Sequence, residues 1–259
     1  MATLTLVEGQ VALVRGPRGY VPAEGVKLKH ADIVHTGQSG FVQIEFDDGT
    51  ALELGAGTRF LAHIPGVVSR PPVWGPHFVL SGWAKLSVPK RKQAQTYRID
   101  SPHFDLLLAT GVAVLRVGAS EAAVFVESGE AIVLEPGSAA QVAVGSGRYY
   151  SRQAGQKGVL AGRPTGQFIK TMPPAFRDTL PTRLAKFKGR DVAPKPGPDY
   201  AYADVEGWLK TEREVRRALV PLMRAKAGDP DFRAELVKNL RHHGEWDPIL
   251  FPEKYRPKD

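Results

Sequence analysis

The chain has 259 residues and a formal net charge of +8, and its length accommodates one large β domain or a domain with an appendage. It contains no cysteine, which excludes structural disulfides and cysteine-ligated metal or haem sites. The basic residues are scattered and lack the aromatic interleaving of RNA-binding motifs, so we expect no nucleic-acid partner. No apolar run reaches about 18 residues, so the sequence predicts no membrane span.

Short alternating segments fill the first part of the chain, beginning with residues 3–16, which end at a Gly-Pro turn. Residues 41–46 alternate apolar and polar side chains with a period of two, which predicts a half-buried strand. Asp48-Gly49 interrupts this alternation, and it resumes at 51–54. Because Asp-Gly is typical of tight hairpins, we expect a two-residue-type turn with Gly49 at positive φ.

A glycine at the entry of a strand recurs three times, at Gly9, Gly82 and Gly129. A glycine in a strand pattern indicates a bulge or a close approach of two backbones. Four prolines in the segment 64–76 predict an irregular loop. Short strands separated by turns continue to about residue 160. The sequence therefore predicts a mainly β fold, a sandwich or a short β-solenoid, over residues 1–160.

The composition changes beyond residue 160. Residues 161–200 are rich in Pro and Gly and predict a linker with a short helix near 182–187, and residues 201–259 predict a small helical region. Asp204 is the expected N-cap of a first helix, which Pro221 kinks or ends. Asp229, followed by Pro230 and an acidic residue, predicts the start of a second helix.

Residues 9–54 and 101–156 resemble the FecR domain family. The match is carried by a Gly-x-Val strand, an Asp-x-x-x-Thr segment, an Asp-Gly-Thr turn and later Gly-containing strands. The matching positions include Asp32, Thr36, Gly40, Asp48, Gly49, Thr50, Gly111 and Gly129. The resemblance implies a periplasmic β domain in which these residues have structural roles. It also implies an exported protein, whose leader would lie outside this sequence.

The sequence indicates no catalytic, cofactor-binding or metal-binding residues. Trp208, Trp246 and Phe251 are instead candidate partner-binding residues, because two short helices cannot bury this much apolar area alone. These side chains must pack on the β domain or on another molecule, either a second copy of the chain or an envelope protein.

Three functions remain open. The first is a non-enzymatic envelope protein whose β domain is a binding or scaffold module for a protein or glycan partner. The second is a component of FecR-type transmembrane signalling in iron-uptake regulation, working with a separate membrane protein. The third is an enzyme that acts on cell-wall material, which the missing acid/base pair disfavours.

Overall fold

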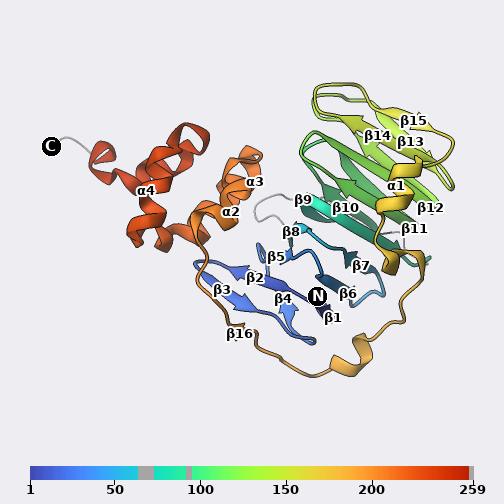
Figure 1. Cartoon of the computed structure of the whole chain (residues 1–259), viewed down its shortest axis with the longest axis horizontal. Helices are drawn as coiled ribbons and strands as arrows, with labels where there is room; N and C mark the ends of the chain where they lie inside the picture. The colour runs from blue at the N-terminus through green and yellow to red at the C-terminus, as the bar shows by residue number, and fades with distance from the viewer. Residues whose placement is uncertain (64–72, 92–94, 257–259) are drawn as a thin grey trace.

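The computed structural model describes residues 1–63, 73–91 and 95–256, and it confirms a mainly β fold with a small C-terminal helical region (Figure 1). The described residues form sixteen strands in one sheet. The strands are β1 (Ala2–Glu8), β2 (Val11–Arg15), β3 (Arg18–Val21), β4 (Lys27–Leu28), β5 (Ile33–Thr36), β6 (Phe41–Phe46), β7 (Ala51–Leu54), β8 (Arg59–Leu61), β9 (Val73–Val88), β10 (Thr96–Asp100), β11 (Asp105–Val117), β12 (Glu121–Leu134), β13 (Gln141–Gly145), β14 (Tyr149–Gln153), β15 (Val159–Ala161) and β16 (Lys195–Pro196).

The sheet is mixed, because β9 and β10 pair in parallel while the other strand pairings are antiparallel. Its long path runs β15-β14-β12-β11-β10-β9-β8-β5-β2-β3-β16, with β1, β4, β6, β7 and β13 attached beside it. Apolar side chains from early and late strands, such as Leu4, Leu115 and Val144, belong to one buried core. The inner face of the sheet therefore encloses the main core.

The hairpin between β6 and β7 confirms one expectation and corrects another. Gly49 has φ +85°, as predicted. The loop has three residues, however, because Phe46 N donates to Thr50 O and Gly49 N donates to Phe46 O. This arrangement is a turn followed by a residue in the left-handed region, which accommodates one residue more than the predicted turn.

The later motif glycines mark a close contact between strands, which the recurring glycine pattern predicts at Gly129. Gly111 and Gly129 face each other across β11 and β12, and both have positive φ. A Cβ at Gly111 would lie 2.1 Å from Ser128 O, and one at Gly129 would lie 2.2 Å from Thr110 O. A side chain at either position would clash with backbone atoms, so glycine is required on both strands.

The segment 162–200, which we call the strap, lies within the range predicted as a linker with a short helix. It contains α1 (Gly166–Thr171), the 3₁₀ turns η1 (Pro174–Arg177) and η2 (Leu184–Phe187), and β16. Figure 1 shows the strap leaving the far end of the sheet at α1 and running along it to the helical region. The expected helix near 182–187 is a single 3₁₀ turn.

The strap covers the polar face of β6, so the strand is buried on both faces and is not half-buried as predicted. Glu45, 2% exposed, accepts hydrogen bonds from the backbone N–H groups of Arg183 at 2.7 Å and Leu184 at 3.3 Å. Lys85, 3% exposed, donates to the carbonyls of Phe176 at 2.5 Å and Asp178 at 3.3 Å. Polar side chains of the sheet thus bind the main chain of the strap.

Two predicted segments differ from the structure or lie outside it. Of the expected loop at 64–76, residues 64–72 lie outside the described residues, and residues 73–76 belong to β9, not to a loop. The first C-terminal helix, α2 (Tyr202–Lys210), begins two residues before Asp204. The Asp204 carboxylate accepts from Ala201 N at 2.8 Å and therefore stabilises the first turn from its third position.

The remaining helices are α3 (Arg213–Met223), α4 (Pro230–Lys238) and α5 (Asp247–Leu250). Pro221 lies inside α3, which ends two residues later, so its expected disruptive effect falls at the helix end. Asp229 caps α4 as predicted, accepting from the N–H groups of Asp231 and Phe232. No helix in the described part of the chain is long and apolar enough to cross a membrane.

Candidate functional site

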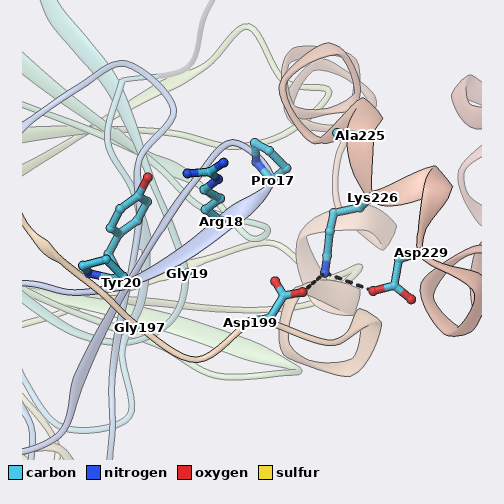
Figure 2. Close-up of a pocket in the computed structure, with 10 residues that line it drawn as sticks. Pro17, Arg18, Gly19, Tyr20, Gly197, Asp199, Ala225, Lys226 and Asp229 are labelled. Carbon is cyan, nitrogen blue, oxygen red and sulfur yellow. Dashed lines mark hydrogen bonds and ion pairs between the residues drawn. The ribbon is translucent and has the colours of Figure 1, made fainter.

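A cleft of about 540 Å³ lies where the β2–β3 hairpin, the end of the strap and the C-terminal helices meet (Figure 2). The hairpin contributes residues 17–20, the strap contributes Pro196, Gly197 and Asp199, and the turn before α4 contributes Ala225, Lys226 and Asp229. The backbone is close-packed here, because a Cβ at Gly19 would lie 2.2 Å from Pro198 O. Three segments far apart in sequence therefore build one concave surface.

Lys226 holds the strap and the helices together beside this cleft. Its ammonium group lies 2.9 Å from Asp199 and 3.3 Å from Asp229, as Figure 2 shows, and the residue is only 5% exposed. The same nitrogen lies 4.7 Å from the ring centre of Tyr200 and 5.3 Å from that of Phe232. Two carboxylates and two aromatic faces satisfy this buried charge, which gives Lys226 a structural role.

A second pocket of about 340 Å³ adjoins the cleft and shares Gly19, Tyr20 and Asp199 with it. His35 lines this pocket and accepts a hydrogen bond from Trp208 Nε1 at 2.8 Å. Burial, assisted by Arg59, lowers the pKa of His35 to about 4. The imidazole is therefore neutral near pH 7, and its Nδ1 carries the proton, because Nε2 is the acceptor.

The two pockets are lined by charged, aromatic and backbone groups. Arg18 is exposed at the cleft, the Tyr20 ring is half-buried beside it, and Asp199 is exposed at its rim. Prolines and backbone segments form much of the remaining wall. Within the described ranges, no group of three or more His, Asp or Glu residues is arranged to hold a metal ion.

The early residues of the FecR-like motif lie inside the fold. Asp32 is fully buried, and its carboxylate accepts two hydrogen bonds from Arg15, at 2.8 and 2.6 Å, and one from Lys29 N at 2.8 Å. The Thr36 hydroxyl donates to Gly55 O at 2.6 Å and accepts from Thr58 N at 2.8 Å. At Gly40 a Cβ would lie 2.4 Å from Gln10 O. These contacts join neighbouring strands and leave no free functional group.

The Asp48-Gly49-Thr50 turn forms a second polar cluster. Asp48 accepts from Thr50 N at 2.9 Å, pairs with Arg91 at 2.6 Å and accepts from the Tyr97 hydroxyl. These partners lower the pKa of Asp48, although burial acts in the opposite direction. The cluster ties the hairpin to the start of β10 and lies apart from the residues that line the cleft.

The candidate partner-binding residues separate into two groups. Trp208 and Trp246 are both 0% exposed within a second core, which also contains Ile33 and Phe78 of the sheet. Trp208 contacts Phe78 edge-on, with ring centres 6.1 Å apart. Neither tryptophan presents its ring at the surface, because the helices pack on the β domain of the same chain. Phe251 is half-buried, with Lys254 4.1 Å from its ring centre.

The sequence interpretation missed an acidic cluster near the start of α3. Arg98 pairs with Asp100 at 2.6 Å and with Asp105 at 2.8 Å. Burial raises the pKa of both carboxyl groups, with Asp105 raising that of Asp100 further. Burial and the charge of Asp105 likewise raise the pKa of Glu212 to about 7. No motif marks these residues, since strand pairing and helix packing bring them together.

The comparisons with known proteins add little to this picture. No protein-family model matches the chain, and no curated protein matches it. Among solved structures it is similar to two crystal structures, at 2.50 and 1.65 Å resolution, of a Parabacteroides distasonis ATCC 8503 protein provisionally described as an anti-sigma factor.

The likeness to these two structures is partial. The TM-score is 0.43 with each, the identities are 15% and 14%, and the match covers 53% of this chain. It spans 62% of the solved chains, so less than two thirds of their length is represented. A likeness of this size carries no argument about function.

Proposed function

We propose that the protein is a non-enzymatic, exported component of the cell envelope, in which residues 1–160 form a FecR-like β domain that binds a protein or glycan partner. The cleft carries this proposal. It combines exposed charged groups, a half-buried aromatic ring and proline walls, which is a lining suited to holding a ligand or an extended partner segment.

The burial of the motif residues supports the same conclusion. The side chains of Asp32 and Thr36 are hydrogen-bonded inside the fold, and the backbone at Gly40 is too closely packed for a side chain. The resemblance therefore concerns the scaffold, and the groups that line the cleft come from the hairpin, the strap end and the helices. Binding at their junction would place the partner between the β domain and the helical region.

A second candidate function is FecR-type signalling with a separate membrane protein. The match over residues 32–54 favours it, since this is the most specific part of the resemblance. In this function the cleft would receive a segment of the membrane protein. Deletion of the gene would then change the iron-dependent transcription of uptake genes, whereas a scaffold function predicts no such change.

Site-specific photo-crosslinking in the native cell tests the proposed binding function. A photoreactive residue replaces Arg18 in the cleft or, as the matched control, the exposed Gln156 at the far end of the sheet. We expect a defined adduct in the envelope fraction from position 18, and its loss when Tyr20→Ala is added. Equal labelling from both positions, no adduct from position 18, or a cytosolic protein would contradict the proposal.

A further inference from the structure

The sheet has four edge strands among the described residues, and three of them carry features that discourage pairing with another strand. These edges are β4, β15 and β16, each of two or three residues. β16 consists of a lysine and a proline and is flanked by Pro194 and Pro198. Short length, lysine and proline are the usual protections of an edge, because they shorten or interrupt the row of free backbone groups.

β13 is the fourth edge, and it has none of these protections. Its five residues pair with β12 alone, so its other side has no strand partner. It lies inside a run of twelve residues, 136–147, that contains no charged side chain. Gln141 and Ala143 are exposed, and neither the strand nor the residues next to it include lysine or proline. The chain as a whole has a net charge of +8, whereas this edge carries no charge.

We infer that β13 is the edge through which two copies of this chain pair. An antiparallel strand edge presents alternating N–H and C=O groups, and a two-fold axis places each donor of one copy opposite an acceptor of the other. A strand that pairs with β13 must be extended and uncharged to match this edge. A second β13 meets both requirements, whereas the other three edges among the described strands carry lysine, proline or too few residues.

The position of β13 favours a closed dimer. Figure 1 shows β13 with β14 and β15 at the end of the sheet remote from the C-terminal helices, so a second copy would not meet the helical region. Val159 and Leu160 of β15, which are 63% and 41% exposed, add apolar surface at this end. Each copy uses the one unprotected edge among its described strands, and the association therefore stops at two chains.

The dimer should be weak and dependent on concentration. Two five-residue strands and a few apolar side chains bury less surface than the roughly 1,200–2,000 Å² of a stable interface. Because the edge is uncharged, salt should not dissociate the dimer, and screening of the net charge should favour it slightly. The proposal is independent of binding at the cleft, which lies at the opposite end of the sheet.

Sedimentation velocity over a wide range of protein concentrations tests this inference. We expect the wild type to shift from one chain to two, and the double variant Gln141→Lys/Ala143→Lys to weaken association at least tenfold. The matched control is Leu222→Lys/Val237→Lys, which adds the same charge at two exposed helical positions and should dimerise like the wild type. Thermal unfolding establishes that each variant is folded.

Amide hydrogen exchange of the wild type provides a test without substitutions. At high concentration the backbone amides of residues 141–145 that face away from β12 should exchange more slowly than in dilute protein. A wild type that stays monomeric, an association that the two double variants weaken equally, assemblies larger than two chains, or unchanged exchange in this strand would each overturn the inference.

Discussion

The two faces of the β6–β7 hairpin are both removed from water, but different parts of the chain cover them. On the inner face, Val42, Ile44, Leu52 and Leu54 are 0% exposed and belong to the main core. On the outer face, Gln43, Glu45 and Glu53 are 1–3% exposed, and Gln43 and Glu45 bind the main chain of the strap. The inner face is stabilised by apolar packing, whereas the outer face is held by the strap, more than a hundred residues later, through hydrogen bonds to Glu45 and the packing of Phe41 against Phe176.

The largest expected effect comes from the inner face. Ile44→Ala removes three buried carbon atoms from a close-packed core and leaves a cavity, so we expect the free energy of unfolding to fall by about 2–5 kcal/mol. Chemical denaturation measures this loss. Val21→Ala, at a position 46% exposed, is the control and should change stability little. A loss below that of the control would show that this face is not the main core.

Glu45→Ala tests the outer face. It leaves the N–H groups of Arg183 and Leu184 without their acceptor, and we expect a loss of about 1–3 kcal/mol. The loss should be local to the strap, so trypsin should cleave after Lys186 faster than in the wild type. Glu130→Ala, at an exposed strand position, serves as the control. Unchanged cleavage would mean that other contacts hold the strap.

The β6–β7 hairpin shows which features of the fold the sequence pattern predicts and which it does not. Alternation located β6 and β7, and Asp-Gly located the turn and the conformation of Gly49, because both signals are local to the chain. The burial of Gln43, Glu45 and Glu53 was not predicted. A strand with one polar face is typical of a solvent-exposed surface, and nothing local indicates that a later segment will cover it.

The cleft was missed for the same reason. Its residues come from three segments, and none of them carries a motif, since the backbone contacts that bring Gly19 next to Pro198 depend on the path of the strap. The buried tryptophans teach the converse lesson. Their apolar area correctly implied that they pack on something, but only the structure shows that Trp208 packs on the sheet of its own chain.

Gly49→Val should have a smaller effect than the loss of either face. The backbone at Gly49 has φ +85°, a conformation that is strained for a β-branched residue, and we expect a loss of about 1–2 kcal/mol. A new Cβ would meet only Pro89 at 3.6 Å, so strain and not crowding is the cause. Asparagine tolerates positive φ, so Gly49→Asn should lose less stability than Gly49→Val. Thermal unfolding of both variants measures the two losses. Equal losses would contradict this explanation.

The smallest effect concerns Glu53, and it depends on pH. Glu53 lies opposite Gln43 on β6 and Lys85 on β9, and its Oε2 has no hydrogen-bond partner among the described residues. Burial raises the pKa of Glu53 to about 7, with the charge of Glu127 adding to the rise and that of Lys85 opposing it. The carboxyl group is therefore protonated more readily in the folded chain than in the unfolded chain.

The raised pKa of Glu53 makes the folded chain less stable as the pH rises. The folded state binds the proton more tightly than the unfolded state. The contribution of Glu53 to stability therefore falls as the pH rises from 4.5, the ordinary pKa of the carboxyl group, to about 7, its pKa in the folded chain, and then stays constant.

Glu53→Gln keeps the shape of the protonated side chain but has no charge to bury. Because histidines and other carboxylates titrate in both proteins, the difference between variant and wild type isolates this one group. We expect the variant to gain about 1–2 kcal/mol relative to the wild type between about pH 5 and pH 8, with no further change above. A difference that is flat across this range would show that Lys85 already neutralises Glu53 in the folded chain, and that the outer face of the hairpin buries an ion pair instead of a protonated acid.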